Sequence, residues 1–177
     1  MRTATKLRSR KSELTEKSSP RAARKHLLLV DDDPGVRGSL QELLLGEGYE
    51  VIPANDGQHA LELLVSTSID LVLLDLNMPR KNGWDTFERL SAEHPLVPVI
   101  LITARPNQLF TAVGAGVGAL LEKPLDIPIL LQTIARLLAE SDEMRLARIA
   151  GRDVPFRYAA GKTDHPAKRG GSNAPAT

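Results

Sequence analysis

The chain has 177 residues, 42% of them apolar, with a formal net charge of +1 and no cysteine. This length predicts one domain of ordinary size, and the lack of cysteine excludes disulfide scaffolds, thiolate metal sites and cysteine nucleophiles. The apolar runs are far shorter than the roughly 20 residues that a membrane span needs. We therefore expect a soluble, cytoplasmic protein without a membrane partner.

The net charge hides an uneven distribution, which begins at the N-terminus. Residues 1–26 hold nine Lys and Arg side chains against two Glu, a net charge of +7, whereas residues 27–140 carry a net charge of −9. Residues 1–25 contain almost no large apolar side chains, so they cannot bury enough surface to offset the entropy lost on ordering. They predict a disordered basic arm.

Residues 26–140 alternate between short apolar runs and helical patterns. A strand over 27–30 is followed by a helical pattern over 34–48. Four more units follow, with strands over 51–53, 71–74, 97–102 and 119–121 and helices over 57–66, 83–93, 106–113 and 127–140. Because these strands are unbroken apolar runs, they predict an α/β domain whose parallel sheet is covered by helices on both faces.

The segment after this domain is short and polar. Residues 141–150 predict a helical extension with Ser141 as its N-cap, and residues 151–177, which contain Gly, Pro, Ala, Ser and basic residues, predict a flexible tail. Residues 141–177 carry a net charge of +3. The segment is too short for a helix-turn-helix output domain, so we expect a stand-alone domain.

Polar residues collect at the carboxyl ends of the predicted strands. They are Asp31, Asp32 and Asp33 after the first strand, Asp75 after the third, Thr103 after the fourth and Lys123 at the end of the fifth. Right-handed crossovers bring these strand ends to one edge of the sheet, where open α/β folds bind ligands. Clustered carboxylates repel one another unless a proton or a hard cation compensates them. With no Cys or neighbouring His, the all-oxygen donor set favours Mg²⁺.

The same set of side chains suits phosphoryl chemistry. An acidic metal pocket that also holds an ammonium and a hydroxyl can neutralise and position a phosphoryl group, and Asp75 is the candidate nucleophile. Asp33 directly precedes Pro34 at the start of a helix, so we expect it to cap that helix and not to bind metal.

The motifs and their spacing resemble a known family. The segments 28–34 (LLVDDDP), 75–79 (DLNMP, with Gly83 beyond it), 103–104 (TA) and 123–124 (KP) together resemble the receiver domain of two-component response regulators, over about residues 26–140. The resemblance implies a flavodoxin-like (βα)5 doubly wound parallel sheet with strand order 2-1-3-4-5. It also implies that Lys123–Pro124 is a cis peptide.

The resemblance also implies a role for each site residue. Asp75 would accept a phosphoryl group from the phosphohistidine of a sensor histidine kinase or a histidine phosphotransfer protein. Asp32 and Asp75 would ligate Mg²⁺ directly, Asp31 would act mainly through bound water, and Asn77 would offer its backbone carbonyl. The protein would catalyse its own phosphotransfer and autodephosphorylation and would not be a turnover enzyme.

Lys123 and Thr103 would read the phosphoryl group in such a domain. Lys123 would pair with the phosphoryl oxygens and the Thr103 hydroxyl would hydrogen-bond them, reshaping a face built from the fourth helix, fifth strand and fifth helix. That face would contact an unidentified downstream protein or a second copy of the chain. Leu120 stands where the family often has an aromatic residue, so we expect this face to switch differently or less, and Arg105 should affect phosphate lifetime.

Two other functions remain open. Asp31, Asp32 and Asp33 after an apolar strand also resemble the Asp-x-Asp motif of haloacid-dehalogenase-type phosphatases, with Asp31 as nucleophile and Asp33 as acid. That family needs an acidic pair downstream of the lysine, and here only Asp126 follows closely. The basic arms would suit a nucleic-acid-associated regulator, although we do not expect nucleic acid to be the main partner.

Overall fold

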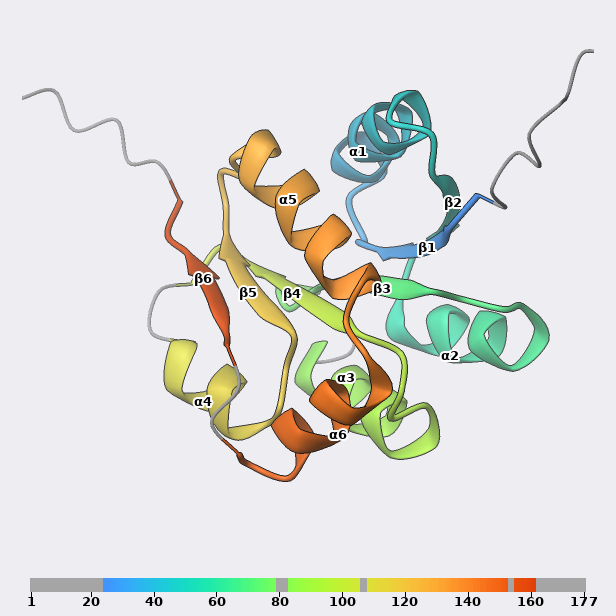
Figure 1. Cartoon of the computed structure of the whole chain (residues 1–177). Coiled ribbons are helices and arrows are strands. Elements are labelled where there is room, and N and C mark those ends of the chain that lie inside the picture. The colour runs from blue at the N-terminus through green and yellow to red at the C-terminus, as the bar shows by residue number, and fades with distance from the viewer. Residues whose placement is uncertain (1–23, 79–82, 106–107, 153–154, 162–177) are drawn as a thin grey trace, which may run out of the picture.

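Six parallel strands form one sheet in the order β2-β1-β3-β4-β5-β6 (Figure 1). The computed structural model describes residues 24–78, 83–105, 108–152 and 155–161. The strands are β1 (His26–Val30), β2 (Glu50–Ala54), β3 (Leu71–Asp75), β4 (Val99–Thr103), β5 (Ala119–Glu122) and β6 (Arg157–Ala159). The helices are α1 (Pro34–Gly46), α2 (Gly57–Ser66), α3 (Gly83–Glu93), α4 (Leu109–Gly114), α5 (Ile127–Leu138) and α6 (Asp142–Ile149).

The sheet divides the core into two apolar clusters. All residues of β3 and β4 are buried, as expected for strands covered on both faces. Successive residues of a strand point to opposite faces, so Leu28 packs with α2, α3 and α4, whereas Leu29 packs with α1 and α5. The predicted doubly wound α/β fold with strand order 2-1-3-4-5 is thereby confirmed for the first five strands.

Local capping sets where the helices begin. The Asp33 carboxylate accepts hydrogen bonds from the backbone N–H groups of Gly35 and Val36 at the start of α1, which confirms its predicted role as a cap. The predicted extension after the domain is α6, and Ser141 caps it by accepting from the N–H of Met144. Within the described segments, no helix is both long and apolar enough to cross a membrane.

The prediction of a flexible tail over 151–177 needs correction. Residues 157–159 form β6, which pairs with the outer edge of β5 so that Leu120 lies opposite Tyr158. The side chain of Phe156 packs against the core cluster beside α2, α3 and α4. Pairing with β6 satisfies backbone hydrogen-bonding groups that would otherwise be exposed at the β5 edge. A three-residue strand is too short to be predicted from its own sequence. The predicted disordered arm (1–25) lies almost wholly outside the described residues, as does the rest of the tail beyond Gly161.

Candidate functional site

Three aspartates meet at the carboxyl edge of the sheet, as predicted. Val30 of β1 pairs with Leu74 of β3, so the next residues along the two strands, Asp31 and Asp75, come together. Asp31, Asp32 and Asp75 each place a carboxylate oxygen within 4.8 Å of the others. The parallel register of two adjacent strands therefore assembles the acidic cluster.

The Lys123 side chain reaches across to two of these carboxylates. Its Nζ lies 2.7 Å from Asp75 Oδ2 and 3.2 Å from Asp31 Oδ2. The Asp31 and Asp75 side chains are each only 4% exposed, and that of Lys123 is 26% exposed. One ammonium is thus shared by two buried carboxylates, while the exposed Asp32 adds a third negative charge. The cluster carries an excess of negative charge.

The environment keeps Lys123 protonated. Burial opposes the charged amine, but the hydrogen bond and charge of Asp75, and then those of Asp31, outweigh burial and raise the pKa of Lys123 above its usual value. Lys123 is therefore a fixed positive charge at neutral pH, placed beside the predicted nucleophile.

Backbone groups orient the two buried carboxylates. Asp31 Oδ1 accepts from the N–H of Asp33 at 2.8 Å, and Asp75 Oδ1 accepts from the N–H of Asn77 at 2.9 Å. In each case the donor lies two residues further along the chain, the geometry of an Asx turn. One oxygen of each carboxylate is held by the backbone, so the other is directed at Lys123.

Thr103 and Asn77 form a second part of the site. The buried Thr103 hydroxyl donates to Asn77 Oδ1 at 3.2 Å and accepts from the backbone N–H of Arg105 at 3.0 Å. Asn77 Oδ1 also accepts from the N–H of Ala104 at 2.7 Å. The backbone carbonyl of Asn77 as a metal ligand stays a prediction, and the side-chain link from Asn77 to the end of β4 was not predicted from the sequence. The expected adjacency of β3 and β4 was the sequence signal from which this contact could have been predicted.

The donor set fits a magnesium ion. All three clustered groups are carboxylates, the exposed Asp32 leaves one side open to solvent, and an excess of negative charge is present. Hard divalent cations such as Mg²⁺ prefer oxygen ligands and retain several waters. The residues therefore agree with the Mg²⁺ expected from the sequence.

Gly83 allows α3 to begin directly against the site. A Cβ built on Gly83 would lie 2.6 Å from the backbone oxygen of Asp75 and 2.6 Å from the Cα of Leu76. Real Cβ atoms do not approach backbone atoms so closely, so a larger residue would displace the segment that carries Asp75. This is a physical reason for glycine at position 83 of the motif.

Three other expectations from the resemblance can be placed in the structure. The Lys123–Pro124 peptide is cis, which confirms the expectation. Leu120 is fully buried in the core. Arg105 is exposed, and its backbone touches Thr103; its effect on phosphate lifetime stays a prediction.

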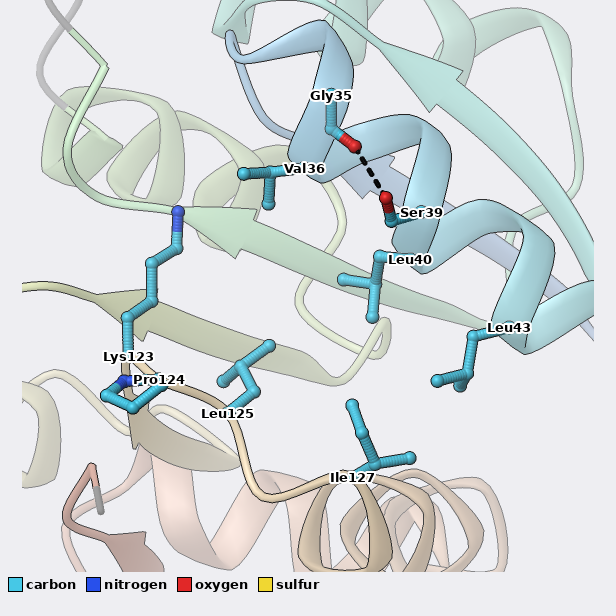
Figure 2. Close-up of a pocket in the computed structure, with 9 residues that line it drawn as sticks. All are labelled: Gly35, Val36, Ser39, Leu40, Leu43, Lys123, Pro124, Leu125 and Ile127. Atoms are coloured by element: carbon cyan, nitrogen blue, oxygen red, sulfur yellow. Dashed lines mark hydrogen bonds between the residues drawn. The ribbon is translucent and has the colours of Figure 1, made fainter. Parts of the chain in front are cut away.

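An apolar groove lies beside the acidic cluster. It has a volume of about 470 Å³ and runs between α1 and the segment that joins β5 to α5 (Figure 2). Its lining is Gly35, Val36, Ser39, Leu40, Leu43, Lys123, Pro124, Leu125 and Ile127. Figure 2 shows the side chains of α1 facing those of residues 125 and 127, with Lys123 beside them. The groove thus connects an apolar surface with the charged site.

The phosphatase alternative is not favoured by the geometry. It requires Asp33 to act as an acid, but the backbone N–H groups of Val36 and Gly35 stabilise the ionised carboxylate and lower the pKa of Asp33. A helix cap held in its charged form is a poor proton donor. The residues invoked for nucleic-acid binding lie mostly outside the described part of the chain.

Comparison with known proteins agrees with this geometry. Residues 27–135 match the family model of the response regulator receiver domain. The transcriptional regulatory protein CpxR of Escherichia coli (strain K12) is 46% identical over 117 residues, which cover 65% of this chain and 50% of CpxR. The transcriptional regulatory protein GlrR of the same strain is 39% identical over 118 residues, which cover 66% of this chain and 27% of GlrR. The chain thus spans half or less of the length of these curated relatives.

Solved structures show the same fold. A CheY-like response regulator receiver domain protein from Methanospirillum hungatei superimposes with a TM-score of 0.63 at 28% identity and covers 68% of this chain and 98% of its own. The response regulator protein TrrA from Thermotoga maritima, in complex with Mg²⁺–BeF, gives a TM-score of 0.60 at 30% identity, covering 64% of this chain and 98% of its own.

Proposed function

Because the chain belongs to the receiver-domain family of response regulators, we propose that Asp75 accepts a phosphoryl group from the phosphohistidine of a sensor kinase or a histidine phosphotransfer protein. One observation carries this assignment to Asp75: the buried carboxylate lies 2.7 Å from Lys123 and within a cluster of three aspartates. The phosphorylated chain would then signal through a protein partner.

The chain's own residues supply the nucleophile and its orientation. A carboxylate oxygen of Asp75 attacks phosphorus while the P–N bond to the donor imidazole breaks, and the imidazole leaves as a neutral ring because its other nitrogen carries a proton. The N–H of Asn77 holds Asp75 Oδ1 during this step. Such positioning supplies much of the catalysis in phosphoryl transfer.

Charge neutralisation completes the proposed site. Asp32 and Asp75 would hold Mg²⁺ directly and Asp31 through water; when bound, the ion neutralises charge on the phosphoryl oxygens. Lys123 brings a second positive charge, and the Thr103 hydroxyl would exchange its hydrogen bond to Asn77 for one to a phosphoryl oxygen. Phosphorylation adds about −1.5 to −2 charges and three strong acceptors, so these two donors have a new group to bind.

The groove beside α1 suits the docking of the phosphoryl donor. Its apolar lining ends at Lys123, so a protein that packs against α1 can present a phosphohistidine to Asp75. Contact of this kind excludes water from the reacting groups, which strengthens the electrostatic interactions there.

The output is proposed to be phosphorylation-dependent protein contact by a cytoplasmic receiver domain, which acts as a phosphoacceptor and not as a turnover enzyme. β6 now occupies the edge of β5, so a homodimer on the face of α4, β5 and α5 would also involve β6. The curated relatives are transcriptional regulators, and the matched segment covers 50% of CpxR and 27% of GlrR.

A small phosphodonor tests the assignment of Asp75. Incubation with acetyl phosphate and Mg²⁺ should give one phosphoryl adduct by intact mass spectrometry, and Asp75→Asn should abolish it because an amide oxygen is a far weaker nucleophile. Asp70→Asn, a matched change remote from the acidic cluster, should leave the adduct unchanged. An adduct that persists in Asp75→Asn would refute the assignment.

A further inference from the structure

We propose that the C-terminal strand β6 is part of the phosphotransfer site, and that Gly161 just beyond it is a positioning residue for Lys123. The inference rests on the proposed function, because it assigns a role within the same reaction. Its basis is the contact between two segments that are 38 residues apart in the sequence.

The strand register brings Gly161 to Lys123. Ala119 of β5 pairs with Arg157, and Leu121 pairs with Ala159. Two further residues along each strand lead to Lys123 and Gly161, which therefore lie beside each other at the carboxyl edge. The end of β6 reaches the same edge as the acidic cluster because all six strands are parallel.

The contact at Gly161 leaves no room for a side chain. A Cβ built on Gly161 would collide with the backbone oxygen of Lys123 and would lie 2.8 Å from its carbonyl carbon and 3.1 Å from Pro124 Cδ. Two of these three atoms belong to the backbone of Lys123, so they cannot move aside as the end of a flexible side chain could. Any larger residue at position 161 must displace the peptide that carries the Lys123 side chain.

Lys123 is held from the other side as well. Its backbone N–H donates to the oxygen of Thr103 on β4 at 2.7 Å. The preceding residue, Glu122, accepts a hydrogen bond from the Tyr158 hydroxyl of β6 at 2.7 Å. The Lys123 peptide thus lies between β4 and the C-terminal segment. These contacts hold the backbone from which Nζ reaches the Asp75 carboxylate.

The segment that carries Gly161 is itself anchored at its start. Arg136 of α5 donates to the backbone oxygen of Pro155 at 3.4 Å and to that of Gly118 at 3.2 Å, linking the entries of β6 and β5. Phe156 packs against the core. Because the start of β6 is fixed in this way and the strand itself pairs with β5, a larger residue at position 161 would act on the Lys123 backbone.

The rate of Asp75 phosphorylation tests whether Gly161 positions Lys123. With acetyl phosphate at saturating Mg²⁺, Gly161→Ala should lower the rate constant of Asp75 phosphorylation about tenfold or more, because displacements near 1 Å can cost about 10²-fold. Gly46→Ala is the matched control, since no heavy atom lies within 4 Å of a Cβ there; it should react at the wild-type rate. Urea unfolding of each variant verifies that it is folded.

A double-mutant cycle separates positioning from general structural damage. If Gly161 acts through Lys123, Gly161→Ala should lower the rate in the wild-type background and add no further loss in Lys123→Ala. The same fold-loss in both backgrounds would overturn the proposal, as would a wild-type rate in folded Gly161→Ala.

A second variant decides the question if Gly161→Ala does not fold. Tyr158→Phe removes only the hydrogen bond to Glu122 and adds no volume. It should slow phosphorylation about twofold to fivefold, corresponding to the net value of one hydrogen bond of about 0.5–1 kcal/mol, and it should have no effect in Lys123→Ala. An unchanged rate would then overturn the proposal. Failure of the wild-type protein to form any adduct would instead refute the proposed function itself.

Discussion

Two buried charged clusters lie at opposite edges of the sheet, and they differ in how their charges are balanced. At the carboxyl edge, one ammonium of Lys123 serves the buried carboxylates of Asp31 and Asp75. At the amino edge, Arg148 of α6 donates two hydrogen bonds to the two oxygens of Glu140, one of them at 2.7 Å. The Glu140 and Arg148 side chains are 4% and 8% exposed.

In the amino-edge cluster, the buried carboxylate has an arginine of its own. The planar guanidinium of Arg148 binds the Glu140 carboxylate in a bidentate manner and also donates to the oxygen of Gly116 at 3.2 Å. Arg145 adds a second positive charge 3.8 Å from Glu140. Arg145 also lies 3.4 Å from Asp142, so two arginines face two carboxylates, and these contacts hold α6 against the domain.

The carboxyl-edge cluster is left incomplete. It holds three carboxylates and one ammonium, which contacts two of them. The repulsion between the carboxylates is relieved when a cation binds. The contrast teaches that burial of charge alone does not mark a functional site. An imbalance of charge, combined with access to solvent through Asp32, distinguishes this site from the structural ion pair.

Among the tests of this contrast, we expect the largest effect on the free energy of unfolding when the amino-edge cluster is changed. Arg148→Met should lower the free energy of unfolding by about 3 kcal/mol, because it removes the main partner of a buried carboxylate. Arg89→Met, which breaks an exposed ion pair of 3.8 Å with Glu93, should cost no more than about 0.5 kcal/mol. Urea unfolding measures both values. Equal losses would show that the Arg148 pair is not structural.

A smaller effect is expected from Mg²⁺ at the carboxyl edge. At a concentration of 100 times its Kd, Mg²⁺ should raise the free energy of unfolding by about 2.7 kcal/mol. Asp32→Asn should remove most of this gain, whereas Glu88→Gln, an exposed change on α3, should keep it. Thermal or urea unfolding with and without Mg²⁺ gives the comparison. An equal gain in Asp32→Asn would contradict the site.

The smallest effect concerns a half-exposed pair at the amino edge. Asp70 accepts from Lys25 Nζ at 2.7 Å and from the N–H of His26 at 2.8 Å. Burial raises the pKa of Asp70, but these hydrogen bonds, with that of Lys25 the larger, outweigh burial and lower it. The stabilisation is therefore present above the unfolded pKa of about 3.9 and is lost as the pH falls through the lower folded value.

Asp70→Asn tests this pH dependence. At pH 7 the change should cost about 1 kcal/mol, and the difference from wild type should shrink as the pH falls below about 4. Urea unfolding at several pH values between 7 and 3 measures it. A difference that stays constant down to pH 3 would show that the charge of Asp70 does not contribute.

The acidic cluster and the first five strands follow from signals that are local in the sequence. Continuous apolar runs, helical spacing and the caps at Asp33 and Ser141 act over a few residues, so they can be read without knowing the fold. Parallel strands end at one edge, which is why Asp31, Asp75 and Lys123 could be placed together from their positions after three strands.

The remaining features depend on contacts between distant residues. β6 has no apolar run of its own. It forms because it pairs with the otherwise open edge of β5 and because Phe156 packs against the core. The Asn77 side chain finds Thr103 only because β3 and β4 are neighbours. The sequence by itself therefore determined the α/β units and the residues of the acidic cluster, since these depend on local patterns and strand polarity. Only the tertiary structure decided that β6 and Gly161 lie against β5 and Lys123, because pairing between distant segments produces no local sequence pattern.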